Sequence, residues 1–572
     1  MNIERPKRKF LPDHFSIDSW EAIEKYLVNL EERNIQNKDD FQKWLNDQSE
    51  LEAVLEENLA WRYIKMTINT KDESLANDYS FFIKEIQPKL TPYTFRLNKK
   101  LSESPFKGSF KNSAYKIYFR SIDTAIKLYR EENIDLDAEI AQKSQQFGSI
   151  SGAQSIKHNG EQLTMQKAAQ LLKENDESLR KDIFEKMANR REKDVDQLDE
   201  LFSDLVKLRH KVARNAGFEN FRDFKFAQLG RFDYTKNDCF TFHQSIKDEI
   251  VPLVKNLAQQ KAKMMGKDKL KPWDTEVDPE GKEPIHPFKN GNELLSKTTT
   301  IFNHIDPYFG DCLKTMDEMG HLDLESKDGK SPGGYNYPLY EIGVPFIFMN
   351  AVGSHRDLIT MVHEGGHAVH SFLNRDLELT GFKSLPSEVA ELSSMSMELL
   401  TMDYWKEFYS STEELKRAKI EQLETILKIL PWVATIDEFQ HWVYENPNHT
   451  ISERKEKWIA LLEDYGNGAT DWSGYEYVRE NTWQRQLHLF EVPFYYIEYG
   501  MAQLGALAVW KNSKSDFQKT IQNYKQALSL GYTKSIPEIY ETAGIRFDFS
   551  KEYIHELAQF IQQELSLIKA DK

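Results

Sequence analysis

The sequence predicts a mostly α-helical protein with one small β-sheet. Hydrophobic residues recur at three- and four-residue steps, the period of an amphipathic helix, through residues 19–33, 184–216, 415–444 and 550–568. The clearest extended segment is residues 344–350, VPFIFMN, which follows a Gly-rich turn at residues 331–336. Hydrophobic residues make up 40% of the 572-residue chain, which is enough to bury a substantial core and excludes a disordered or collagen-like chain.

Each of these elements has a local reason in the sequence. Residues 19–33 begin with Asp18 or Ser19 as a helix cap and place Trp20 and Ile23 on one apolar stripe. Residues 184–216 keep the helical period for about nine turns and are predicted to form one long helix. Residues 266–293 are rich in proline, glycine and charge, so we expect a large irregular loop there.

Charge and cysteine content exclude several classes of protein. The 75 Lys and Arg residues against 91 Asp and Glu residues give a net charge of −16, which argues against nucleic acid as the main partner because phosphates would be repelled. Cys239 and Cys312 are too few for a disulfide framework. The chain lacks a run of about 18 apolar residues and the apolar core of a signal peptide, so we expect a cytoplasmic protein without a membrane partner.

Residues 357–373, DLITMVHEGGHAVHSFL, contain an H-E-x-x-H pattern at His363, Glu364 and His367. Residues four apart lie on one face of a helix, so the two imidazoles can share one metal ion. Glu364 can then reach a water molecule on the metal without being a ligand, and Zn²⁺ lowers the pKa of that water to about 7. The alternative is a helix with two incidental histidines. Gly365 and Gly366 disfavour it, since each costs about 1 kcal/mol relative to alanine in a helix.

A catalytic zinc ion needs a third protein ligand and an open position. His370 lies on the same short helix and would crowd one side of the metal, so we interpret it as a packing or orienting residue. A second predicted helix, residues 387–401, places Glu388, Glu391 and Glu398 on one face. A buried carboxylate without a partner is costly, so carboxylates on this partly apolar helix need one, and a zinc ion can be that partner. The alternative is that this acidic face of the helix is exposed to solvent.

These two helices resemble peptidase family M3, the group of oligoendopeptidase F and thimet oligopeptidase. The family pattern H-E-x-G-H-A-x-H is matched by HEGGHAVH, with Gly366 and His370 at the corresponding positions. The family's third zinc ligand is followed by a serine three residues on and a glutamate seven residues on, which Glu391, Ser394 and Glu398 match. Gly365 departs from the family, which usually carries a larger side chain there, and the departure would widen the cleft.

The resemblance covers roughly residues 110–560 and implies a fold and an organisation. Further matching segments are GSISGAQ, GEQLTMQKAAQLL, ARNAGFENFRDF and KPWDTEVDP. The family fold is a two-lobed helical zincin around a deep cleft, with the small sheet near the site. We expect an N-terminal helical part at residues 1–110, an oligoendopeptidase F-like N-terminal region at 111–190 and a catalytic region at 191–572, packed together as one unit.

The resemblance also implies roles for residues at the site. His363, His367 and Glu391 would hold one zinc ion, and Glu364 would be the general base. The segment HLFEVPFYYIEYG resembles the family's C-terminal site segment, in which a histidine is followed by paired tyrosines. On that match His488, Tyr496 and Tyr499 are the candidates for stabilising the oxyanion, which makes them catalytic residues together with Glu364. The histidine-to-tyrosine spacing is one residue shorter than in thimet oligopeptidase, so Tyr495 could replace Tyr496, and an aromatic core helix is the alternative for all of them.

Two segments near the site are candidates for binding substrate. The sequence KSPGGY matches the family's flexible Gly-rich loop, which makes Gly333, Gly334 and Tyr335 candidate substrate-binding residues. Residues 344–350 could be an exposed strand edge that holds a peptide through its main chain, or an ordinary buried strand.

Together these expectations describe a zinc-dependent endopeptidase that hydrolyses internal bonds of short unstructured peptides with a water activated by zinc and Glu364. Two alternatives stay open: a helical HExxH zinc carboxypeptidase, and an inactive zinc-fold binding protein, which the intact Glu364 disfavours. A His₂Glu site of this kind accepts Co²⁺ or Mn²⁺ as well as zinc.

Overall fold

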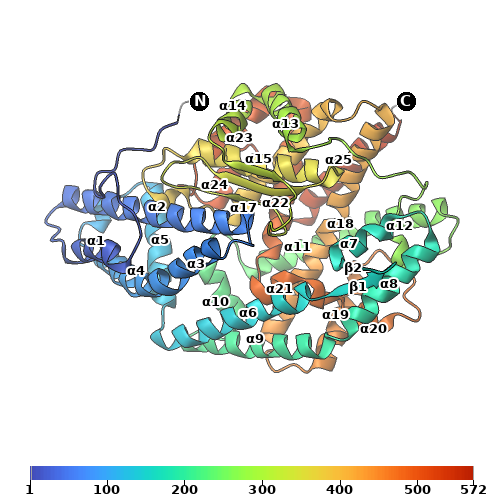
Figure 1. Ribbon diagram of the computed structural model, residues 1–572, viewed down its shortest axis with the longest axis horizontal. Helices are drawn as coiled ribbons and strands as arrows, with labels where there is room; N and C mark the ends of the chain where they lie inside the picture. The colour runs from blue at the N-terminus through green and yellow to red at the C-terminus, as the bar shows by residue number, and fades with distance from the viewer. Residues whose placement is uncertain (2, 571–572) are drawn as a thin grey trace. The chain divides into compact units, whose positions relative to one another are not determined.

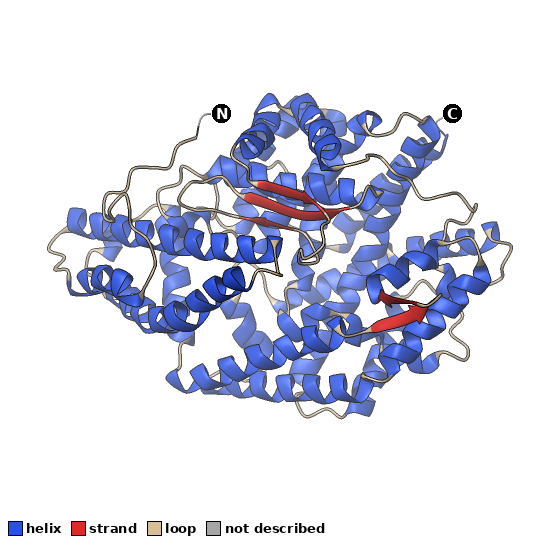
Figure 2. Ribbon diagram, viewed as in Figure 1, coloured by secondary structure: helices blue, strands red, loops and turns tan. Residues whose placement is uncertain are grey.

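The computed structural model describes residue 1 and residues 3–570. The chain is 69% helical with small sheets, which confirms the predicted fold class (Figure 2). It divides into two compact units, each assembled from three segments: unit 1 is Met1–Lys127, Ile285–Lys419 and Ala502–Phe547, and unit 2 is Leu128–Pro284, Ile420–Met501 and Asp548–Lys572. None of the described helices is long and apolar enough to cross a membrane.

Unit 1 contains most of the N-terminal helices and the helices around the H-E-x-x-H motif (Figure 1). Its helices are α1 (Trp20–Glu32), α2 (Lys38–Ile68), α3 (Glu73–Phe81), α4 (Gln87–Ser102), α13 (Gly291–Ile305), α14 (Pro307–Glu318), α15 (His355–Asn374), α16 (Thr380–Lys383), α17 (Ser387–Thr401), α23 (Phe517–Ser529) and α24 (Ile536–Thr542). Ser19 caps α1 as predicted, because its side chain accepts a hydrogen bond from the Ala22 N–H.

Unit 2 is also built mainly of helices. They are α6 (Ile134–Gly152), α7 (Met165–Gln170), α8 (Glu177–Glu192), α9 (Val195–Asn215), α10 (Phe221–Gln228), α11 (Lys236–Glu249), α12 (Val251–Met264), α19 (Ile451–Tyr465), α20 (Glu476–Glu480), α21 (Leu487–Glu491) and α25 (Lys551–Ala570). Three further helices run across a unit boundary along the chain: α5 (Ser113–Leu128), α18 (Thr412–Glu445) and α22 (Tyr496–Ser515).

The predicted helix at residues 184–216 is instead two helices, α8 and α9. The break lies at Asp194, whose N–H bonds the Arg191 carbonyl at 2.9 Å and so closes a tighter three-residue turn. The Asp194 carboxylate accepts hydrogen bonds from Gln154 at 2.8 Å and from Arg190 at 2.7 Å. Because Gln154 is 40 residues away in sequence, helical periodicity could not indicate this break.

Two small sheets accompany the helices. In unit 2, β1 (Ser155–His158) pairs antiparallel with β2 (Glu161–Thr164) through an Asn159-Gly160 turn with φ angles of 48° and 86°, the backbone that a two-residue hairpin needs. In unit 1 the strand order is β3-β5-β4, with β3 (Leu322–Glu325) parallel and β4 (Tyr335–Tyr337) antiparallel to β5 (Phe346–Ala351).

β5 is the predicted strand at residues 344–350, and it lies in the middle of its sheet. Both of its edges are paired, so the interpretation as an exposed peptide-binding edge is wrong and the buried-strand interpretation is correct. α15 packs against β5, β4 and α17. The irregular loop predicted at residues 266–293 is confirmed up to Asn290, which caps the start of α13, and its Trp273, Ile285 and Phe288 side chains are buried.

Candidate active site

The helix that carries the H-E-x-x-H motif begins at a capping box two turns before His363. The Ser354 hydroxyl accepts a hydrogen bond from the Asp357 N–H, and the Asp357 carboxylate accepts one from the Ser354 N–H. This reciprocal pair fixes where α15 starts, and therefore which face of the helix carries His363 and His367.

The two glycines of the motif let neighbouring helices approach α15 closely. A Cβ atom at Gly366 would lie 2.7 Å from the Ser394 Cα atom of α17, too close for any side chain. The Ser393 hydroxyl donates a hydrogen bond to the Gly366 carbonyl at 2.8 Å, which joins the two helices directly. A Cβ atom at Gly365 would lie 2.6 Å from the Phe302 ring of α13, so this glycine leaves room for Phe302 instead of widening a cleft.

Three predicted metal ligands converge between α15 and α17. Ligand atoms of His363, His367 and Glu391 all lie within 4.8 Å of one another. The Glu391 Oε2 atom is 3.3 Å from His363 Nε2 and 3.7 Å from His367 Nε2. The two histidine side chains are 21% and 19% exposed, so this donor set is accessible at its rim. Two imidazoles and one carboxylate are a donor set that zinc accepts.

Two further side chains orient these donors. Glu398 Oε1 lies 2.7 Å from His363 Nδ1, which leaves His363 Nε2 directed toward Glu391. The Ser394 hydroxyl donates a hydrogen bond to Glu391 Oε2 at 3.0 Å. Burial raises the pKa of Glu391, but the His363 hydrogen bond and the charges of both histidines outweigh it and lower that pKa to about 2. The carboxylate of Glu391 is therefore ionised at neutral pH.

Glu364 lies beside this donor set and is buried. Its burial, which is the largest cause, raises the pKa of its carboxyl to about 7, while the charge of His363 opposes the shift. The Asn336 side chain donates a hydrogen bond to the Glu364 backbone carbonyl at 3.2 Å and ties β4 to α15. A carboxyl whose pKa is near 7 is suited to both accepting and returning a proton.

Two of the competing ligand candidates, His370 and Glu388, lie outside the convergent set, whereas the third, Glu398, contacts His363. His370 is buried further along α15, and burial together with the His367 charge lowers its pKa to about 3. Glu388 is buried at the start of α17, where its backbone carbonyl accepts a hydrogen bond from the Tyr540 hydroxyl. Neither residue belongs to the three-residue cluster of His363, His367 and Glu391.

The Gly-rich segment leads directly into β4. Gly333 has a φ of 100°, a conformation that favours glycine, and its carbonyl accepts a hydrogen bond from the Asn350 side chain. A Cβ atom at Gly334 would lie 3.4 Å from the Phe348 carbonyl oxygen of β5. The Tyr335 ring stacks on Phe348 at 4.8 Å and its hydroxyl lies 2.6 Å from the Thr67 hydroxyl, so this phenol is held within unit 1.

The predicted tyrosines form one aromatic cluster with His488 in unit 2. The His488 ring centroid is 4.7 Å from Tyr496, 6.0 Å from Tyr499 and 6.3 Å from Tyr495. The Gln486 side-chain amide lies 2.6 Å from His488 Nδ1, and burial lowers the pKa of His488 to about 4. Burial also raises the pKa of Tyr496, so at neutral pH the cluster offers an uncharged imidazole and a protonated phenol.

A strained residue positions this cluster. Phe494 is fully buried and has a φ of 67°, which is uncommon for a residue with a side chain. Its N–H donates a hydrogen bond to the Gln440 side chain at 2.6 Å, and its carbonyl accepts one from Arg231. Arg231 also pairs with Glu498 at 2.9 Å. These contacts fix the turn that carries Tyr495 and leads into α22 at Tyr496.

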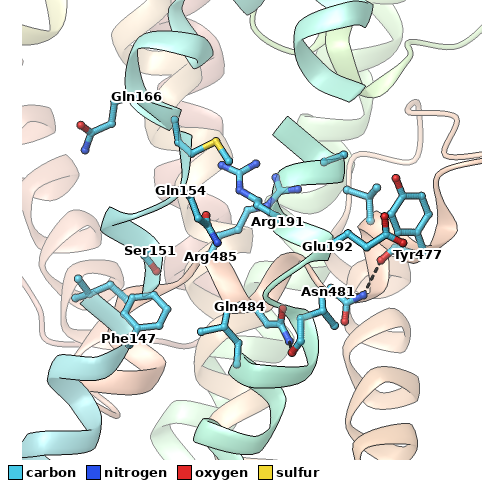
Figure 3. Close-up of a pocket in the computed structure, with 16 residues that line it drawn as sticks. Phe147, Ser151, Gln154, Gln166, Arg191, Glu192, Tyr477, Asn481, Gln484 and Arg485 are labelled. Atoms are coloured by element: carbon cyan, nitrogen blue, oxygen red, sulfur yellow. Dashed lines mark hydrogen bonds between the residues drawn. The ribbon is translucent and has the colours of Figure 1, made fainter. Parts of the chain in front are cut away.

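Unit 2 also contains a pocket of about 300 Å³ (Figure 3). Its polar lining includes Arg191, Arg485, Gln154, Gln484 and Asn481, and its sixteen lining residues include neither a histidine nor a cysteine. None of the predicted site residues lines it. Because the pocket lacks a set of metal ligands, we do not assign it a part in metal-dependent chemistry.

Sequence reasoning missed Asn336, and it considered Glu398 as a candidate ligand but not as the partner of His363. Glu398 carried a signal, since it stands seven residues after Glu391 and therefore two turns along the same face of α17. Asn336 carried none, because its contact with Glu364 depends on how β4 packs against α15.

Two family models match the sequence over most of its length. The model described as peptidase family M3 matches residues 170–559, and the model described as the peptidase M3 N-terminal domain matches residues 10–129. The first of these covers more than half of the chain and includes both the α15–α17 donor set and the tyrosine cluster.

Individual relatives agree with the family models. An oligoendopeptidase F homolog of Borreliella burgdorferi is 22% identical over 64% of this chain, and one of Lactococcus lactis is 22% identical over 55%. The alignments span 61% and 52% of those relatives, so this chain covers less than two thirds of their length. A solved structure of a PZ peptidase A with an inhibitor superposes with a TM-score of 0.88 at 27% identity, covering 99% of this chain and 98% of that one.

Proposed function

The chain belongs to peptidase family M3 and is a metallopeptidase, and from this premise we propose that it is a zinc-dependent endopeptidase acting on internal bonds of short unstructured peptides. The observation that supports this proposal most strongly is the convergence of His363, His367 and Glu391, with Glu364 beside them. The names of the matched relatives, which are oligoendopeptidase F homologs, support an internal cleavage position.

The residues present fit a bound zinc ion. We propose His363, His367 and Glu391 as its three protein ligands, which is the number that leaves a catalytic zinc one open position. The hydrogen bond between His363 Nδ1 and Glu398 selects the ring tautomer whose Nε2 is available as a ligand. When bound, zinc would supply Lewis-acid chemistry, polarising a carbonyl and lowering the pKa of a water molecule to about 7.

Glu364 is proposed as the general base and acid. Its carboxylate takes a proton from the attacking water and then returns that proton to the amine that leaves when the peptide bond breaks. A carboxyl pKa of about 7 suits both halves of this transfer, because near neutral pH such a group takes up a proton and gives it up with similar ease. Asn336 positions the residue through its backbone carbonyl.

His488, Tyr496 and Tyr499 are proposed to stabilise the oxyanion that forms on the scissile carbonyl. The raised pKa of Tyr496 keeps its hydroxyl protonated at neutral pH, so it donates a hydrogen bond without carrying charge. Such donors act mainly in the transition state, where negative charge has developed. Gly333, Gly334 and Tyr335 are proposed to contact the substrate main chain, and the tie between Tyr335 and Thr67 would hold that segment in place.

An internally quenched peptide blocked at both ends tests the cleavage position. An endopeptidase separates the fluorophore from the quencher in such a peptide, whereas a carboxypeptidase needs a free C-terminal carboxylate. We expect cleavage of short blocked peptides by the zinc-loaded protein, with products that map to internal bonds by mass spectrometry. Cleavage of only the unblocked peptide, one residue from its C-terminus, would instead establish a carboxypeptidase.

A further inference from the structure

A second cluster of metal-binding side chains lies in unit 2, between α11 and α18. Cys239 and His243 stand four residues apart on α11, and Asp437 and His441 stand four residues apart on α18. A spacing of four places each pair on one helix face, with Cβ atoms about 5–6 Å apart. Each helix therefore presents two potential ligands to the other.

Three of these side chains converge on one point. Ligand atoms of Cys239, Asp437 and His441 all lie within 4.8 Å of one another. The Asp437 Oδ2 atom is 3.2 Å from His441 Nε2 and 2.8 Å from His243 Nε2. Ligands around one zinc ion stand at bond lengths of about 2.0–2.3 Å, so small rotations of these side chains would bring all three into coordination distance.

The cluster is deeply buried and leaves polar atoms unsatisfied. The exposed fractions are 0% for Cys239 and Asp437, 2% for His441 and 4% for His243. Within the described part of the chain, Asp437 Oδ1 and His441 Nδ1 have no hydrogen-bond partner. A buried polar atom without a partner costs about 1–3 kcal/mol, so two such atoms on the ligand candidates of one cluster indicate a partner that binds there.

We propose that Cys239, Asp437 and His441 bind a second divalent metal ion of the zinc type, with a structural role. A thiolate, a carboxylate and an imidazole are all zinc ligands, and the two negative charges offset the charge of the ion. Binding displaces the proton of the Cys239 thiol, which leaves to solvent. His243 orients the Asp437 carboxylate by donating its Nε2–H to Oδ2.

The surroundings favour a structural ion over a catalytic one. The rings of Phe240, Phe494 and Phe226 lie 4.9, 5.3 and 5.8 Å from the His441 ring and shield it from water. The adjacent carboxylate of Glu438 cannot act as a base toward this point, because it accepts hydrogen bonds from Lys457 and Tyr465. The ion would thus join α11 to α18, and this proposal holds whether or not the chain cleaves peptides.

Metal content measured on three full-length proteins tests the proposal. Each protein is loaded with excess zinc, and unbound zinc is removed by gel filtration. Inductively coupled plasma mass spectrometry should then find two zinc ions per chain in the parent. Cys239→Ser should hold one. Cys312→Ser is the matched control, because Cys312 is also 0% exposed, lies on α14 and belongs to neither cluster. It should hold two. One zinc ion in the parent, or two in folded Cys239→Ser, would overturn the proposal.

Cobalt substitution tests the same point without relying on a variant that folds. The parent loaded with two equivalents of Co²⁺ should show a thiolate-to-cobalt charge-transfer band in the near ultraviolet. The α15–α17 donor set contains no sulfur, so this band can only come from a cysteine site. Cys312→Ser should keep the band and Cys239→Ser should lose it. A parent without the band, or a band that disappears in Cys312→Ser, would refute Cys239 as a ligand.

Discussion

The two clusters of potential metal ligands in this protein differ in what surrounds them. In the α15–α17 cluster, His363 and His367 are about one-fifth exposed, and the buried carboxyl of Glu364 lies alongside. In the α11–α18 cluster the potential ligands Cys239 and His441 are almost fully buried among aromatic rings. Both clusters use ligand pairs four residues apart on helices.

The comparison shows that the ligand pattern alone does not decide between catalysis and structure. What distinguishes the α15–α17 cluster is access for a substrate and a neighbouring group able to move a proton. Mutations there should change turnover while the fold persists. Mutations in the α11–α18 cluster should change metal content or stability and affect turnover only indirectly.

The largest effect on turnover is expected from Glu364→Gln. This change removes the proposed base but keeps the size of the side chain, so kcat should fall by about 10²–10⁴-fold. Zinc content should stay that of the parent, because Glu364 is not among the converging ligands. Steady-state kinetics and metal analysis on one preparation would check both. A variant that loses its zinc would instead identify Glu364 as a ligand.

A somewhat smaller effect is expected from Tyr496→Phe. Removing one hydroxyl that acts in the transition state should lower kcat and kcat/KM together by about 10²–10³-fold, with KM nearly unchanged. Tyr495→Phe is the matched control, because the Tyr495 and Tyr496 rings both contact His488. This control variant should behave close to the parent. If Tyr495→Phe carries the loss, the one-residue difference in spacing has been assigned wrongly.

Glu398→Gln should have a more modest effect, which is a lower affinity for the metal. Glu398 acts through His363, and partners of this kind typically change metal affinity by about 10–100-fold. A competition titration with a chromophoric chelator would measure the change. At saturating zinc, turnover should largely recover, which separates an orienting residue from a direct participant. Unchanged affinity would mean that the Glu398 hydrogen bond does not support the metal.

The smallest effect on the metal is expected from His370→Ala. His370 is buried on α15 outside the convergent set, so the variant should keep the zinc content of the parent even if the lost packing lowers its melting temperature. Metal analysis alongside thermal unfolding would distinguish these two outcomes. An empty but folded His370→Ala would make His370 a ligand.

Helix bounds were predicted well where they depend on local sequence signals such as capping residues. α17 (Ser387–Thr401) has the predicted bounds, and the capped start of α1 was visible in Ser19. The break between α8 and α9 was not predictable, because it depends on a hydrogen bond from Gln154 to Asp194. The Asn159-Gly160 hairpin did carry a recognisable turn signal and was still missed.

The candidate site was predictable only in part, from the helical period and from the resemblance to the family. The helical period placed His363 and His367 on one face, and resemblance to the family selected Glu391 from the acidic residues of α17. The α11–α18 cluster could not be found in this way, because His243 and Asp437 are 194 residues apart. Pairs four residues apart are common on helices, and only the packing of two helices brings such pairs together.

The central claim is that His363, His367 and Glu391 hold the metal on which peptide cleavage depends. A zinc titration of metal-depleted Glu391→Ala and Glu388→Ala, followed by cleavage of a blocked quenched peptide, tests it most directly. We expect Glu391→Ala to lose high-affinity zinc at this site and to stay inactive, while Glu388→Ala binds zinc and regains activity like the parent. The opposite pattern, with Glu388→Ala empty and Glu391→Ala active, would contradict the account.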